Sequence, residues 1–178
     1  MVDIPNKIRI AERKDVENIA LLASGIFLPN ECIGLKAQLM GYLNNPETMK
    51  LSPEQLADRG ICVAQEWYVA EAVSNGELLG FSGIEKAAYE GDFDIAWLNW
   101  TGIQTKFQGN GLGRKLLEHV EDKAKEYGIN SFFVETNPYY PAAVRMYERH
   151  GFVLVAKIPD YYGPGKDVLQ YRKEFLKP

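Results

Sequence analysis

Apolar residues recur at helical spacing in the stretch that runs from 112 to 127. The apolar positions fall on one stripe of a helix, and charged residues fill the rest of its circumference. Gly128 follows the last apolar position, where a residue in the left-handed conformation commonly ends a helix. The pattern predicts an amphipathic helix whose buried stripe consists of Leu112, Leu116, Leu117, Val120, Ala124 and Tyr127.

Two apolar runs flank this helix, and both are typical of strands. Phe93 to Ile103 and Ser131 to Thr136 are rich in aromatic and β-branched residues. A strand, a loop, a helix and a second strand in this order predict a right-handed crossover between parallel strands. The loop before the helix then lies at the carboxyl end of the first strand, where open α/β sheets bind ligands.

Periodicity and turn residues predict the rest of the fold. Asn75 and Gly76 mark a tight hairpin, and Ser52 with Gln55 has the pattern of a capped helix start. The other elements expected, in chain order, are a strand over 7–11, helices over 15–25 and 31–43, strands over 66–73 and 78–85, a short helix between Pro141 and Gly151, and strands over 153–158 and 168–175. Together they predict an α/β fold with one mixed sheet, formed by a single domain over 1–178.

Composition and charge exclude several classes of function. The chain has 178 residues and a net charge of −4 with both signs interspersed, so we expect no nucleic-acid partner and no membrane association. No apolar run approaches membrane-spanning length and no secretory leader is evident, which predicts a cytoplasmic protein. The two cysteines, Cys32 and Cys62, and the two histidines are too isolated to predict a disulfide or a metal site.

The string QGNGLG, Gln108 to Gly113, fills the loop ahead of the amphipathic helix. Glycines let the backbone approach a ligand closely, and the first N–H groups of a helix are unpaired donors at the positive end of its dipole. The loop therefore predicts an anion-binding cradle. Its spacing differs from the dinucleotide pattern GxGxxG, and it lacks the GK[ST] ending of a P-loop.

Two motifs carry a resemblance to a known family. Gln108, Gly111 and Gly113 match the pattern Q/R-x-x-G-x-G/A, and a later string matches A-x-x-x-Y-x-x-x-G-F through Ala143, Tyr147, Gly151 and Phe152. In this respect the chain resembles the GNAT superfamily of N-acetyltransferases over about residues 61–175. The resemblance implies a twisted, mostly antiparallel sheet whose central parallel pair is splayed into a V between flanking helices.

The resemblance also implies acetyl-coenzyme A as co-substrate and no metal. An acetyl-CoA-binding core is expected over 93–152, and the variable segment over 26–60 is expected to bind the acceptor amine. The implied contacts to the coenzyme are Gly102, Ile103, Gln108, Gly109, Asn110, Gly111, Leu112, Gly113, Arg114 and Asn137. Many relatives carry Asn three residues before the motif alanine, where this chain has Tyr140, so the role of Asn137 in contacting the pantetheine arm stays open.

For the chemistry, the resemblance assigns Tyr147 as the general acid that protonates the leaving thiolate. The general base is left open among Glu85, Asp94, Glu135 and a water molecule. Lys106, Arg114 and Lys115 are candidates for the 3′-phosphate of the coenzyme, because they surround the start of the helix. Trp97, Trp100, Tyr161 and Tyr162 are candidates for the walls of the acceptor pocket, although core packing is the alternative for the tryptophans.

The sequence therefore supports an N-acetyltransferase that acts on a primary amine of a small molecule, peptide or protein by direct attack in a ternary complex. The alternative is a non-catalytic sensor or partner module that binds an acyl-coenzyme A and has lost the chemistry. The superfamily analogy also allows a homodimer formed through the late strands. The sequence does not name the acceptor.

Overall fold

The computed structural model describes residues 5–27, 29–44, 47–59, 63–87 and 94–175. The strands are β1 (Asn6–Ile10), β2 (Val63–Ala72), β3 (Leu78–Ala87), β4 (Ile95–Ile103), β5 (Ser131–Thr136), β6 (Val153–Ile158) and β7 (Val168–Glu174). The helices are α1 (Val16–Ser24), α2 (Pro29–Asn44), α3 (Pro53–Asp58), α4 (Leu112–Glu126) and α5 (Pro141–Arg149). The predicted elements are confirmed with small shifts at their ends, while Cys62 and Phe93 lie outside the described residues.

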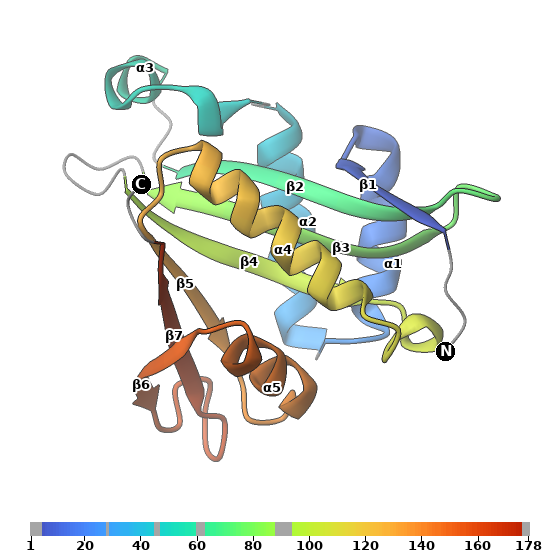
Figure 1. Cartoon of the computed structure of the whole chain (residues 1–178), viewed down its shortest axis with the longest axis vertical. Coiled ribbons are helices and arrows are strands. Elements are labelled where there is room, and N and C mark those ends of the chain that lie inside the picture. The colour runs from blue at the N-terminus through green and yellow to red at the C-terminus, as the bar shows by residue number, and fades with distance from the viewer. Residues whose placement is uncertain (1–4, 28, 45–46, 60–62, 88–93, 176–178) are drawn as a thin grey trace.

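All seven strands join one sheet in the order β1-β2-β3-β4-β5-β7-β6. Every neighbouring pair is antiparallel except β4 and β5, which confirms the predicted parallel pair. These two strands pair only from Ile95 to Leu98 against Ser131 to Val134. Beyond Leu98 they diverge, and Figure 1 shows β5 leaving the direction of β4. The predicted V is therefore present, and its arms separate toward the glycine loop.

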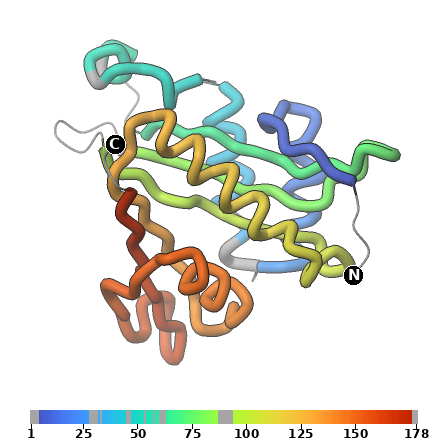
Figure 2. The backbone as a smooth tube through the Cα atoms, viewed as in Figure 1, coloured from blue at the N-terminus to red at the C-terminus, as the bar shows by residue number. Residues whose placement is uncertain are grey.

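Helices cover both faces of the larger arm of the sheet. Helix α4 crosses one face of β2, β3 and β4, and α1 and α2 lie on the other face (Figure 1). The smaller arm holds β5, β6, β7 and α5, as the tube in Figure 2 shows. Leu117 and Val120 of α4 are fully buried against the sheet, and Trp67 and Phe81 are fully buried on the opposite face. The two apolar layers fix β4 between them.

The sequence signals at helix ends are confirmed by local geometry. Gly128 adopts a φ of 74° just after α4, which is the left-handed region that glycine tolerates best. Before α3, the Gln55 amide N–H donates to the Ser52 hydroxyl and the Ser52 N–H donates to the Gln55 side chain. This reciprocal pair is the predicted capping box.

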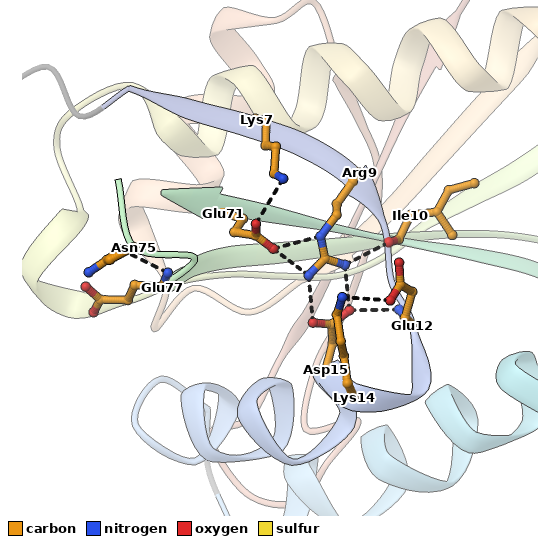
Figure 3. A network of polar contacts seen from close by, with 9 residues as sticks. All are labelled: Lys7, Arg9, Ile10, Glu12, Lys14, Asp15, Glu71, Asn75 and Glu77. Carbon is orange, nitrogen blue, oxygen red and sulfur yellow. Dashed lines mark hydrogen bonds and ion pairs between the residues drawn. The ribbon is translucent and has the colours of Figure 1, made fainter. Parts of the chain in front are cut away.

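A charged network attaches the first strand to the start of α1 (Figure 3). The guanidinium of Arg9 donates to both carboxylate oxygens of Asp15 at 2.7 and 2.9 Å, and it also pairs with Glu71 of β2. Burial alone would raise the pKa of Asp15, but the hydrogen bonds from Arg9 and from the N–H of Glu12 outweigh it and lower the pKa. The network holds β1, β2 and α1 together at one end of the sheet.

In the part of the chain that the structure describes, no helix is both long and apolar enough to cross a membrane.

Candidate active site

A cleft of about 930 Å³ opens where β4 and β5 part. The glycine loop and the first turn of α4 form one wall, and α5 forms the wall facing them. The floor consists of residues from β3, β4 and β5, and α2 contributes Gln38. The two motifs that lie about thirty residues apart in the sequence therefore meet across one cavity.

The glycine loop presents an uncapped helix start to this cleft. Gly109 and Gly111 adopt φ values of 77° and 79°, and nothing lies within 4 Å of where a Cβ would stand at either residue. Gly111 is the N-cap of α4, and no side chain caps the helix. The Gln108 side chain donates to the carbonyl of Ile103 at 3.0 Å and so ties the loop to the end of β4. The first N–H groups of α4 are left to a ligand.

Gly113 serves a different purpose from the other two glycines of the loop. A Cβ at Gly113 would come within 3.3 Å of the Met146 sulfur on α5 and 3.7 Å of Ile103. Glycine at this position therefore permits the close approach of α4 and α5. Leu112 and Arg114 also line the cleft, whereas Asn110 does not.

Strand β4 offers an edge to the cleft beyond the point where it leaves β5. Its other edge pairs with β3 through Phe81↔Gly102 and Gly80↔Ile103. Ile103 lines the cleft and Gly102 does not, because the Cβ direction at Gly102 is filled by the Phe81 ring at 2.7 Å. Gly102 is buried, so Ile103 is the residue that this end of β4 presents to the cleft.

Trp100 interrupts the regular pairing of β4 with β3. Its φ is 45°, an unfavourable value for a bulky residue, and the register shifts there by one residue. The indole N–H donates to the Gln38 side chain at 2.6 Å, and the ring meets Phe27 edge to face at 5.3 Å. Contacts from the segment around α2 therefore hold a strained residue in the cleft wall.

Tyr147 of α5 reaches the cleft from the same side of the sheet as α4. It is 5% exposed and packs against Phe152 and Tyr171. Burial raises the pKa of its phenol, while a hydrogen bond with Thr101 opposes that rise. The Thr101 hydroxyl is itself 2.8 Å from the hydroxyl of Ser82. Tyr147 is therefore a protonated hydroxyl beside the fork of the two strands.

Glu85 and Glu135 line the cleft from the opposite side of the sheet. Glu85 accepts a hydrogen bond from the Asn99 amide at 2.7 Å. Burial raises the pKa of Glu85, the hydrogen bond from Asn99 lowers it, and the charge of Glu135 raises it further. Glu135 is exposed and accepts a hydrogen bond from Gln170 at 3.3 Å. Of the two carboxylates, Glu85 is the one whose surroundings raise its pKa, as is common for a general base.

Asp94 does not line the cleft, so the expectation that it faces the site is wrong. It immediately precedes β4, at the end of the strand away from the glycine loop, and its carboxylate accepts a hydrogen bond from Asn130 at 3.0 Å. Its carbonyl receives the N–H groups of Asn130 and Ser131. Asp94 therefore closes the turn between α4 and β5.

The cationic side chains at the cleft differ from those expected. Lys106 and Lys115 do not line it, and Lys106 pairs with Glu77 instead. Arg114 does line it, together with Arg145 and Arg149 of α5, which sequence reasoning missed, and His150, which caps the end of that helix. The arginines of α5 stand four residues apart, so the helical spacing was a signal that could have found them.

Asn137 is buried and lines the cleft, but its side-chain oxygen is engaged. It accepts the Tyr139 N–H at 2.9 Å, and the Asn137 carbonyl accepts the Tyr140 N–H. This is an Asx turn that leads into α5. What Asn137 has left to offer a ligand is the donor Nδ2. The Tyr139 hydroxyl reaches the Gly165 carbonyl at 3.0 Å and holds the late loop near this turn.

The aromatic candidates divide between the cleft and its surroundings. Trp97 stacks on Phe133 at 4.9 Å while lining the cleft, and Trp100 and Tyr162 line it as well. Tyr161 does not line the cleft and packs edge to face on Tyr162 at 4.7 Å. Both tryptophans are partly exposed, so they belong to the cleft wall rather than to the fully buried core.

Comparisons with solved structures show that this fold is known. A GNAT-family protein from Desulfovibrio desulfuricans superposes with a TM-score of 0.75 at 22% identity, covering 96% of this chain and 99% of that one. The yncA protein of Salmonella typhimurium, solved with acetyl-CoA, also gives 0.75, at 17% identity and with 98% and 96% coverage. At these identities the likeness establishes the fold.

Sequence relatives of this chain include acetyltransferases that it matches over only part of their length. The chain is 28% identical over 127 residues to the N-alpha-acetyltransferase RimI of Mycobacterium tuberculosis, covering 71% of this chain and 77% of that protein. It is 29% identical over 153 residues to the mycothiol acetyltransferase of Streptomyces avermitilis, covering 80% of this chain. The matched part spans only 46% of that enzyme, and 33% of the IAA acetyltransferase of Azospirillum brasilense.

One family model matches a stretch of the chain that contains both motifs. The sequence model of the acetyltransferase (GNAT) family matches residues 37–152, which is more than half of the chain. The match includes the glycine loop and the helix that carries Tyr147, the two segments that the structure places across one cleft. The chain therefore belongs to the acetyltransferase (GNAT) family.

Proposed function

We propose that this protein transfers an acetyl group from acetyl-coenzyme A to a primary amine by direct attack in a ternary complex. The observation that carries the proposal is the cleft at the fork of β4 and β5. It brings together an uncapped helix start, a buried phenol and a half-buried carboxylate. Anion binding, a proton donor and a proton acceptor are the three requirements of thioester aminolysis.

The donor half of the site would hold the coenzyme through its charge and its backbone. The N–H groups of Gly109 to Gly113 bind the pyrophosphate, and Arg114, Arg145 and Arg149 supply positive charge for the phosphates. The free edge of β4 near Gly102 and Ile103 pairs with the pantetheine amides, and one N–H there polarises the thioester carbonyl. The amide nitrogen of Asn137 donates to the same arm.

The acid and the base approach the thioester from opposite faces of the sheet. Glu85 takes a proton from the acceptor ammonium, and the amine nitrogen then attacks the carbonyl carbon. The new C–N bond forms, the C–S bond breaks, and the thiolate takes a proton from Tyr147. The nitrogen then gives up its second proton, which restores the Tyr147 phenol, and Glu85 releases the first proton to solvent. Burial raises the pKa of both groups, which keeps the Tyr147 phenol protonated, as a proton donor must be, and makes the Glu85 carboxylate a stronger base for the ammonium proton.

The segment over 26–60 would form part of the acceptor side. Its residues Phe27 and Gln38 line the cleft and hold Trp100 in place. This supports the assignment of acceptor recognition to that segment and of coenzyme binding to residues 93–152.

Other expectations stay predictions. A cytoplasmic location and the absence of a metal rest on the sequence argument alone. Homodimerisation through the late strands is supported by β6, which forms an edge of the sheet and exposes Val153, Leu154 and Val155. Sedimentation of the purified protein measures its mass in solution, and a monomer at every concentration would reject the dimer.

The proposal is tested first by ligand-dependent melting. Acetyl-CoA is expected to raise Tm in proportion to its occupancy, whereas ATP and NAD, which carry related phosphates, are expected to raise it much less. Release of free thiol is then followed across a panel of amines. Melting stabilised by acetyl-CoA, without thiol release for any amine, would favour the alternative of a non-catalytic acyl-CoA-binding module.

A further inference from the structure

Charge is segregated across the cleft. The arginines that line it, Arg114, Arg145 and Arg149, come from α4 and α5. Among the described residues of α2, β3, β4 and β5 that line it, the charged ones are Glu85 and Glu135. The coenzyme phosphates account for the cations of the donor half. The carboxylates of the other half are available to recognise the acceptor.

Strand register places the two carboxylates on one face. Glu85 pairs with Trp97, and Trp97 pairs with Phe133, so these three side chains form one row across the sheet. Glu135 stands two residues after Phe133 and therefore points to the same side. Asn99, two residues after Trp97, confirms the direction because its amide reaches Glu85.

The two carboxylates differ in depth. Glu85 lies inside the cleft and is largely shielded from solvent, whereas Glu135 is exposed where β5 has left β4. The charge of Glu135 contributes to raising the pKa of Glu85, so the two groups are within electrostatic reach of each other. Two like charges facing one space repel, and a ligand with two positive charges relieves that repulsion.

The walls of this half are aromatic. Trp97, Trp100 and Tyr162 line the cleft around the carboxylates. Aromatic faces attract alkylammonium groups and accommodate the methylene chain between them. An amine that bears a carboxylate would meet two negative charges here, because the arginine on this face, Arg172 over the Phe133 ring, does not line the cleft and is paired with Glu174. Amino acids therefore fit the site poorly.

Resting on the proposed function, we propose that the acceptor is a small amine with a second cationic nitrogen, a diamine or polyamine. The reacting nitrogen lies at Glu85, and the second nitrogen lies at Glu135 near the mouth of the cleft. Glu135 is thus a specificity-determining residue that binds the non-reacting end of the substrate.

The experiment uses three amines with four carbon atoms each: 1,4-diaminobutane, butylamine and 4-aminobutanoate. They differ only in whether the far end is cationic, neutral or anionic. After correction for its two equivalent amines, the diamine is expected to exceed butylamine in kcat/KM by about fivefold, the value of one solvent-exposed ion pair. The anionic analogue is expected to fall below butylamine by a similar factor.

Two substitutions assign the effect to its residue. Glu135→Gln is expected to bring the diamine-to-butylamine ratio close to one. Glu126→Gln, which removes an exposed carboxylate outside the cleft, is the matched control and is expected to preserve the ratio. Added salt is expected to raise KM for the diamine more than for butylamine, because the second contact is electrostatic.

The outcomes separate this inference from the function on which it rests. Thiol release with equal kcat/KM for the diamine and butylamine would overturn the diamine inference while leaving the acetyltransferase in place. Preference for a peptide N-terminus over all three amines would overturn it as well. Absence of thiol release with every amine, despite binding of acetyl-CoA, would instead remove the proposed function.

Discussion

Tyr147 is the residue on which the proposed chemistry depends most directly. Phenylalanine at this position would keep the ring contacts to Phe152 and Tyr171 and remove only the hydroxyl. We expect Tyr147→Phe to lower kcat by about 100-fold or more, the usual contribution of a general acid, with the Kd for acetyl-CoA nearly unchanged. Steady-state kinetics and a binding titration measure the two quantities. A variant with full kcat would show that Tyr147 is only a packing residue.

The base role proposed for Glu85 would link catalysis to stability, because its carboxylate is half-buried. Burial raises its pKa in the folded state, so its favourable contribution is present at acid pH and is lost as the pH rises through the folded value. At neutral pH the ionised group therefore costs stability. We expect Glu85→Gln to lower kcat about 100-fold while leaving Tm unchanged or raising it by about 2 °C.

The pH dependence distinguishes this explanation from simple damage to the fold. Melting of both proteins at neutral and at acid pH is the measurement, and any gain in Tm should disappear at acid pH, where Glu85 is protonated in the folded and unfolded states. A variant that melts well below the parent at neutral pH would contradict the account. So would one that retains full kcat.

At the same scale, the sequence predicted which residue types form the site but not which carboxylate reaches it. Glu85 enters the cleft because the register of β3 against β4 sets it opposite Trp97, and register depends on long-range pairing. Asp94 is only three residues from Trp97 in the chain, yet it lies before β4 begins and binds Asn130. Local patterns carry no information about this difference.

At the scale of elements, we expect acetyl-CoA binding at the start of α4 to weaken when a glycine of the loop is replaced by a residue with a side chain. Gly111→Ala places a methyl group in the space of the cradle and strains a residue whose φ is 79°. We expect the Kd for acetyl-CoA to rise at least about tenfold, equivalent to about 1.4 kcal/mol. A binding titration measures the change.

Gly128→Ala is the matched control for that substitution. Gly128 has a φ of 74°, has open space at its Cβ position and follows the far end of α4. Both variants are expected to lose about 1 to 2 kcal/mol of stability from the same strain, and only Gly111→Ala is expected to lose binding. Equal loss of binding in both would mean that strain, not the cradle, was responsible.

Strands and helices were predictable from sequence because short-range periodicity determines them. The buried stripe of α4 is confirmed at Leu112, Leu116, Leu117, Val120 and Ala124. The irregularity of β4 was not predictable. Trp100 belongs to a residue type that avoids positive φ, and the contacts that hold it there come from Gln38 and Phe27 of a distant segment.

At the scale of the whole molecule, the Arg9 network is expected to matter for stability rather than for chemistry. Asp15 is nearly buried, so Arg9→Met would leave a carboxylate without its main partner. We expect a loss of about 2 kcal/mol at neutral pH, or about 4 to 8 °C in Tm. Lys36→Met, which breaks an exposed pair with Glu17, is the control and should change Tm by much less.

The sign of the pH effect follows from Asp15. Its pKa is lowered in the folded state, so its contribution is present above the unfolded pKa and is lost as the pH falls through the folded value. The difference in Tm between Arg9→Met and the parent should therefore shrink as the solution is acidified. A difference that grows on acidification would contradict this account of the network.

In the proposed function, the V between β4 and β5 lets one sheet serve two ligands. The strands pair over four residues and then part, so the coenzyme and the amine can approach the same edge from opposite faces. The donor half was predictable because glycine spacing and helix starts are local features. The acceptor half was not, because Glu85, Glu135 and Trp100 come from separate strands and meet only in the folded sheet.

The central claim is that this cleft moves an acetyl group from a thioester to an amine. The most direct measurement is mass spectrometry of both products after a single turnover with acetyl-CoA and 1,4-diaminobutane. The account predicts one N-acetylated amine for each free coenzyme A released. Free coenzyme A without acetylated amine, or bound acetyl-CoA that persists unchanged beside the amine, would contradict it.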